Sequence, residues 1–177
     1  MRVTPAGTLR DALSEDNRMT TRIVVFEGPV SSDWIDYNGH MNDACYVVVF
    51  SKAIDEFMLR LGLNETFRAQ RQVSIYTLQS MVHYLQEVGE GEPLRVDIQL
   101  LESDSKKLRV FIRMLHADTG KELAAMESLL LHMDMTSHRA APLLPETQGR
   151  VDEIQQAHAS LPFPVLAGRS IALRRPA

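Results

Sequence analysis

One short segment of the chain places a carboxylate, a tight turn and a helix start next to one another. Asp36 is followed by Asn38-Gly39, a pair that favours a turn because both residues tolerate positive φ. Asn42 is a good helix N-cap, and Asp43 after it suits the positive end of a helix dipole. A helix start has free backbone N–H groups that can bind a carbonyl oxygen as it becomes an oxyanion. The segment either serves acyl transfer or hydrolysis, or is a structural turn and cap.

The residues on either side predict the elements that hold this segment. Residues 22–26 are rich in β-branched side chains and predict a strand that ends at Gly28-Pro29. Residues 43–61 predict a long helix that stops at Gly62, because apolar residues recur at helical spacing. Its valine-rich first part also has the composition of a buried strand, but the preceding cap favours a helix. This first part is apolar nearly all round, so we expect protein to surround the helix.

Further along the chain, apolar residues alternate with polar ones, as in half-buried strands. Short links between these strands predict an antiparallel meander. Pro145 then begins a predicted short helix that ends near Ser160. The predicted strands cover residues 73–86, 94–100, 108–114 and 122–135.

Length and composition predict a single globular domain. The chain has 177 residues, of which 45% are hydrophobic, and its net charge is −4. We expect a mobile N-terminal arm over residues 1–20, a folded domain over 21–160 and a C-terminal tail over 161–177. The acidic balance gives no reason to expect nucleic acid or an anionic membrane surface as a partner. No apolar run approaches the roughly twenty residues that span a bilayer.

The cysteine and histidine content argues against a metal site. Cys45 is the only cysteine, which excludes an internal disulfide and a cysteine-based metal cluster. We therefore expect no metal and no cofactor, and a reducing, cytoplasmic location. The histidines that lack ligand spacing are His83, His116, His132 and His138.

The Asp36 segment resembles the active-site region of the hotdog-fold acyl-CoA thioesterases of the 4-hydroxybenzoyl-CoA thioesterase type. The matching residues are Asp36, Gly39, His40, Asn42 and Tyr46. The resemblance implies an α+β hotdog fold: a curved antiparallel sheet of about five strands wrapped around one long central helix, with a short C-terminal helix. It also implies that a second copy covers the exposed edge strand, with the acyl-CoA site at that interface. We expect an obligate homodimer, or a homotetramer built from two dimers.

The resemblance implies a role for each residue of the segment. Asp36 would attack a thioester carbonyl or act as general base on water. The backbone N–H of Asp43, with Asn42 and Ala44 nearby, would bind the carbonyl oxygen. His40 either orients Asp36 or only braces the loop, and Asn42 caps the helix. The Asp43 side chain would act on Asp36 electrostatically. Other carboxylates that could replace Asp36 in this role are Asp33, Asp55 and Glu56.

A narrower resemblance points to one group of hotdog enzymes, the betainyl-CoA thioesterases of carnitine breakdown. It implies betainyl-CoA as the substrate, whose acyl group ends in a quaternary ammonium. Such a group cannot donate a hydrogen bond and prefers aromatic faces. The segments that carry the resemblance, in this order, are residues 34–41, 84–87, 131–134, 157–162 and 168–171.

Aromatic residues are available for such a cage, and the same residues also suit core packing. Two alternatives to betainyl-CoA hydrolysis stay open: a thioesterase for other short-chain or aromatic acyl-CoAs, and a non-catalytic acyl-CoA-binding module. The candidate substrate-binding residues are Trp34, Tyr37, Tyr46 and Tyr76, with Tyr84 also available.

Overall fold

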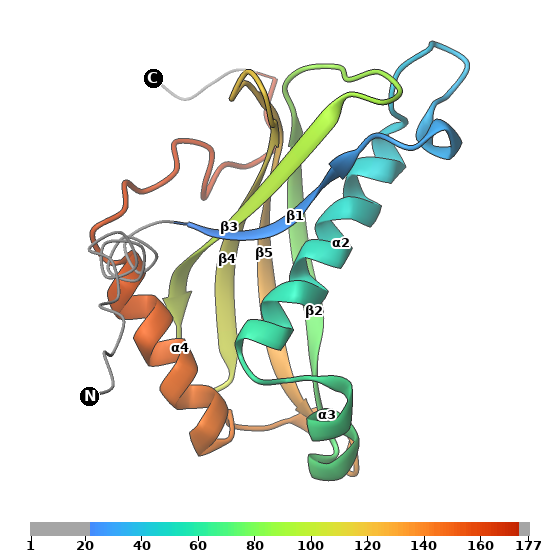
Figure 1. Cartoon of the computed structure of the whole chain (residues 1–177). Helices are drawn as coiled ribbons and strands as arrows, with labels where there is room; N and C mark the ends of the chain where they lie inside the picture. The colour runs from blue at the N-terminus through green and yellow to red at the C-terminus, as the bar shows by residue number, and fades with distance from the viewer. Residues whose placement is uncertain (1–21, 174–177) are drawn as a thin grey trace, which may run out of the picture.

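The structure is a computed structural model, and it describes residues 22–173 (Figure 1). The predicted arm over residues 1–20 lies outside the described residues. The elements are, in chain order, β1 (Ile23–Pro29), the short 3-10 helix η1 (Ser32–Trp34), α2 (Asp43–Arg60), α3 (Glu65–Arg71), β2 (Val73–Tyr84), β3 (Pro93–Ser103), β4 (Lys107–His116), β5 (Glu122–Asp134), β6 (Arg139–Ala140) and α4 (Pro145–His158).

The strands form one antiparallel sheet in the order β1-β3-β4-β5-β2, and the short strand β6 pairs with β5. The sheet curls, and α2 lies along its concave side (Figure 1). Most of the core forms between this helix and the inner side chains of the strands. The predicted α+β hotdog fold is confirmed, including the five long strands, the central helix and the C-terminal helix.

The predicted meander is correct for β3, β4 and β5 but wrong for β2, which pairs with β5 and not with β3. The cause lies in the link of residues 85–92, which is longer than a tight hairpin turn. The backbone N–H groups of Leu85 and Gln86 both donate to the Leu123 carbonyl, which keeps the chain beside β5. Val88 is then buried in the core. The link therefore carries the chain from β2, beside β5, across to β3, and the two strands that it joins do not pair with each other.

The start and the end of α2 follow from local signals. The Asn42 side chain accepts a hydrogen bond from the Ala44 backbone N–H at 3.0 Å, so the predicted N-cap is confirmed. Gly62 follows the helix with φ of +81°, a left-handed conformation that favours glycine. A Cβ at Gly62 would also lie 3.0 Å from Nε of Arg150. These local signals determine where the helix begins and ends.

One face of α2 is buried and the opposite face is open. Val47 and Val48, in its first half, are 40% and 45% exposed. The expectation that protein surrounds the helix is therefore wrong for the single chain, because the sheet curls around only one side of it. The residues of α2 that are buried are Tyr46, Val49, Phe50, Ala53, Ile54, Phe57 and Met58.

Helices α3 and α4 each begin at a local sequence signal. Helix α3 was not predicted, because it is short and has no apolar stripe; the Asn64 side chain caps it by accepting from the Phe67 N–H at 2.8 Å. Helix α4 begins at Pro145, as predicted, and its buried His158 accepts a hydrogen bond from the Leu100 N–H at 2.9 Å. None of the helices in residues 22–173 has the length and hydrophobicity that crossing a membrane requires.

The described part of the C-terminal tail lies against the face of the sheet opposite α2. The Gly168 backbone N–H donates to the Glu127 carboxylate of β5 at 2.5 Å. The Arg109 guanidinium of β4 lies 5.7 Å from the ring centre of Phe163. The tail thus covers part of the outer face and leaves the α2 side of the sheet free for the candidate site.

Candidate active site

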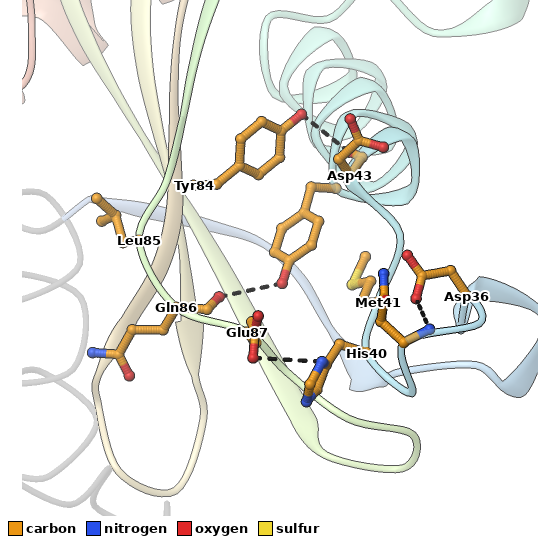
Figure 2. Close-up of a pocket in the computed structure, with 10 residues that line it drawn as sticks. Asp36, His40, Met41, Asp43, Tyr84, Leu85, Gln86 and Glu87 are labelled. Atoms are coloured by element: carbon orange, nitrogen blue, oxygen red, sulfur yellow. Dashed lines mark hydrogen bonds and ion pairs between the residues drawn. The ribbon is translucent and has the colours of Figure 1, made fainter.

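A cavity of about 560 Å³ lies where the turn before α2 meets the end of β2 (Figure 2). Two stretches of the chain form it, residues 36–46 and residues 84–87, and the curl of the sheet brings them together. The residues that line it are Asp36, Asn38, His40, Met41, Asp43, Tyr46, Tyr84, Leu85, Gln86 and Glu87.

Backbone hydrogen bonds fix the turn that carries Asp36. The Asp36 N–H donates to the His40 carbonyl, and the Gly39 N–H donates to the Asp36 carbonyl, both at 3.0 Å. The Asp36 carboxylate accepts the Asn38 N–H through Oδ1 at 2.8 Å. Its second oxygen, Oδ2, has no hydrogen-bond partner among residues 22–173. One carboxylate oxygen therefore holds the turn, and the other is available for a ligand.

The first turn of α2 presents one free amide. The Asn42 N–H donates to the Trp34 carbonyl at 2.8 Å, and the Ala44 N–H donates to the side chains of Asn42 and Asp43 at 3.0 and 2.9 Å. The Asp43 N–H has no partner in the described part of the chain. A free amide at the positive end of a helix suits a developing oxyanion. The donor that the resemblance implied is thus also the one that the hydrogen bonds leave open.

Two tyrosines form the aromatic wall of the cavity. The rings of Tyr46 and Tyr84 meet edge to face, with centroids 5.5 Å apart and an angle of 85° between their planes. The Tyr84 hydroxyl donates to the Asp43 carbonyl at 3.1 Å, and the Tyr46 hydroxyl donates to the Gln86 carbonyl at 3.3 Å. Tyr46 is buried, whereas Tyr84 is half exposed. The hydroxyls therefore tie the helix to β2, and the Tyr84 ring remains accessible.

Burial raises the pKa of both tyrosines above its ordinary value, and nearby carboxylates raise it further. Burial is the largest cause of the raised pKa in both tyrosines. The next largest cause is the negative charge of Glu87 for Tyr46 and that of Asp43 for Tyr84. Both hydroxyls are consequently neutral donors at pH 7 and keep their hydrogen bonds there.

The structure brings most of the predicted catalytic segment to the cavity. Asp36, His40 and Asp43 line it, whereas the Asn42 side chain is used as the helix cap. The His40 ring lies 3.4 Å from the Glu87 carboxylate (Figure 2). The alternative carboxylates are not among the lining residues; they are Asp33, Asp55 and Glu56, the last of which pairs with Arg60 at 3.4 Å.

The structure brings only one of the four predicted substrate-binding residues, Tyr46, to this cavity. Tyr37 is 96% exposed in the turn. The Trp34 ring lies instead beneath Nζ of Lys52, 5.6 Å from the ring centre. Tyr76 lies on β2, away from the cavity.

A β-bulge explains why Tyr84 lines the cavity and Tyr76 does not. Strict alternation would put both on one face of β2, since their numbers differ by eight. The pairing register shifts between Thr77 and Gln79, so that Tyr76 lies opposite Leu131 and Tyr84 lies opposite Ala124 on β5. Those two partners are seven residues apart on a regular stretch of β5 and face opposite sides. The bulge therefore turns the end of β2 toward the helix.

Sequence reasoning did not assign a role to several lining residues of the 84–87 stretch. The only signal was that these residues form one of the segments that resemble the betainyl-CoA thioesterases. Within the described residues, no three His, Cys, Asp or Glu side chains come together in a way that could hold a metal ion.

A curled antiparallel sheet around one helix is the hotdog fold. A carboxylate and a free amide at a helix N-terminus, close together, are groups that suit thioester hydrolysis. The family model of the thioesterase-like superfamily matches residues 30–151, which include both stretches that line the cavity. The chain belongs to this family and is a thioesterase-family enzyme.

Individual relatives agree with this assignment. The betainyl-CoA thioesterase of Pseudomonas aeruginosa is 38% identical over 155 residues, which cover 88% of this chain and 98% of the relative. A Pseudomonas putida protein of solved structure, assigned as a thioesterase without a named substrate, is 32% identical with a TM-score of 0.75, over 88% of this chain and 99% of that one. A hypothetical protein of Staphylococcus aureus, solved in complex with CoA, has a TM-score of 0.81 over 86% of this chain and 97% of that one. It is 22% identical and shows the shared fold.

Proposed function

We propose that the chain hydrolyses acyl-CoA thioesters, with betainyl-CoA as substrate and betaine and CoA as products. The proposal rests on the observation that Asp36 and Asp43 line the same cavity, and that the Asp43 N–H has no hydrogen-bond partner among the described residues. The Pseudomonas aeruginosa relative is named a betainyl-CoA thioesterase, and its match covers 88% of this chain and 98% of the relative, which supports this substrate.

The geometry supports a reaction in which the thioester carbonyl oxygen accepts the Asp43 N–H. That hydrogen bond strengthens as the oxygen gains charge, and the dipole of α2 adds to it. The Asp36 carboxylate, on the other side of the carbonyl carbon, then acts in one of two ways. The helix cap at Asn42 serves the reaction indirectly, because it keeps the Asp43 amide at the helix end.

In the nucleophilic route, Oδ2 of Asp36 bonds to the carbonyl carbon and the carbon–sulfur bond breaks, releasing CoA as a thiolate. Water then hydrolyses the mixed anhydride and restores Asp36. In the general-base route, Asp36 takes a proton from water, the resulting hydroxide attacks the same carbon, and the proton passes to the departing thiolate. In both routes His40 positions the carboxylate, because its carbonyl accepts the Asp36 N–H.

We also propose that the enzyme is a homodimer that pairs along β2. This strand is an edge of the sheet, and Tyr76 and Leu78 on it are 43% and 51% exposed. Unpaired edge strands with exposed apolar side chains favour pairing with a second chain. Tyr84 and Leu85, at the end of β2, line the cavity, so a partner on this edge would border the site. Two such dimers could associate further into a homotetramer.

The test is a panel of acyl-CoAs assayed with the purified protein and a thiol reagent that detects released CoA. We expect hydrolysis of betainyl-CoA with a kcat/KM at least about tenfold above that for acetyl-CoA, equivalent to about 1.4 kcal/mol of transition-state stabilisation. Equal rates on both would contradict the substrate, and preference for an aromatic acyl-CoA would favour a broader thioesterase. Tight acyl-CoA binding without release of CoA would instead favour a non-catalytic binding module.

A further inference from the structure

The ionisable side chains that line the cavity are mostly acidic. Asp36, Asp43 and Glu87 contribute carboxylates, and His40 is the one lining group among the described residues that can become positive. Neither Lys nor Arg is part of the described lining. A concave site with one sign of charge concentrates ligands of the opposite sign. The lining therefore favours an acyl group that carries positive charge.

The three carboxylates differ in how firmly other groups hold them. Asp36 accepts the Asn38 N–H at 2.8 Å, and Asp43 accepts the Ala44 N–H at 2.9 Å. The Glu87 side chain is 77% exposed, and its ion pair with His40 is long, at 3.4 Å. Such exposed pairs contribute little to stability. Glu87 is thus the carboxylate that can turn toward a ligand at the smallest cost.

Glu87 also lies close to the aromatic wall. After burial, its charge is the main cause that raises the pKa of Tyr46, which places the carboxylate within electrostatic reach of that ring's hydroxyl. Figure 2 shows Glu87 below Tyr84 and next to His40. The half-exposed ring of Tyr84 belongs to the same wall. A quaternary ammonium is attracted both to an aromatic face and to a carboxylate, so both features of this wall favour such a group.

We propose that Glu87 is a specificity-determining residue, whose carboxylate selects acyl groups with a positive charge next to the thioester carbonyl over neutral groups of the same shape. This inference rests on the proposed function. In a betainyl group a single methylene separates the nitrogen from the carbonyl carbon. A carbonyl bound at the Asp43 amide therefore keeps the charge inside this cavity, near Glu87 and the tyrosines.

The test compares two substrates of the same shape. Betainyl-CoA has a trimethylammonium head, and 3,3-dimethylbutyryl-CoA has a neutral tert-butyl head in its place. We expect Glu87→Gln to lower the ratio of their kcat/KM values about tenfold, mainly through a higher KM for betainyl-CoA. Glu90→Gln is the matched control: Glu90 is exposed on the same link, lies outside the cavity lining, and should leave the ratio unchanged.

Each outcome separates this inference from the proposed function. A Glu87→Gln enzyme that keeps the wild-type ratio, or that loses activity equally on both substrates, would overturn the role of Glu87 while thioester hydrolysis stands. A wild-type enzyme that prefers the neutral substrate would overturn it as well. A wild-type protein that releases CoA from neither compound would overturn the proposed function itself.

Discussion

Asp36→Ala is expected to lower kcat for betainyl-CoA about a thousandfold, because it removes the carboxylate that we propose as nucleophile or general base, whose Oδ2 has no hydrogen-bond partner among the described residues. Asp36→Asn separates chemistry from structure. Its amide oxygen still accepts the Asn38 N–H and keeps the turn, whereas its lost charge removes both the nucleophile and the base. We therefore expect Asp36→Asn to be nearly as inactive as Asp36→Ala, as measured by CoA release at saturating substrate.

Asp33→Asn is the control for this pair of variants. Asp33 is a second acidic residue near the turn, on η1, and it lies outside the cavity lining. Its substitution should leave kcat within about twofold of the wild type, since surface substitutions away from special features have small effects. An Asp36→Asn enzyme with wild-type kcat and an unchanged melting temperature would remove Asp36 from the chemistry.

Leu78→Glu is expected to convert the proposed dimer into a monomer. In a pair of chains joined along β2, each copy would bring a new negative charge to the seam, and inward-facing charge on an edge strand opposes pairing. Like charges across an interface cost several kcal/mol, so the dimer Kd should rise about a hundredfold or more. Sedimentation at micromolar concentration should show a mass near the 20.0 kDa of one chain, in place of twice that mass.

Val165→Glu provides the comparison. Val165 is 80% exposed on the C-terminal tail and lies on the outer side of the sheet, so the same change there should leave the mass unchanged. We expect the Leu78→Glu monomer to lose activity as well, because in the proposed dimer the partner would border the open side of the cavity. A wild-type enzyme that is monomeric and fully active would contradict this part of the account.

The elements that local chemistry determines could be predicted from the sequence. Helix α2 starts at its Asn42 cap and stops before Gly62, because a cap and a left-handed glycine act within a few residues. Asp36 and Asp43 line one cavity for the same reason, since a short hydrogen-bonded turn joins them.

Long-range arrangements could not be predicted in the same way. Alternation along β2 defines its two faces but not its neighbour, and the chain reaches β5 because the link of residues 85–92 is anchored by backbone bonds to Leu123. The bulge at Leu78 is defined by the pairing with β5, which the sequence of β2 alone does not give, and because of it Tyr84 and not Tyr76 lines the cavity. The open face of α2 likewise depends on how far the sheet curls.

The central claim is best tested by a crystal structure with a ketone analogue of betainyl-CoA, in which a methylene replaces the thioester sulfur and blocks hydrolysis. The account predicts the ketone oxygen at hydrogen-bond distance, about 3 Å, from the backbone nitrogen of Asp43, with the Asp36 carboxylate facing the carbonyl carbon. An analogue seated with its carbonyl on any other element, and with the Asp36 turn left empty, would contradict it.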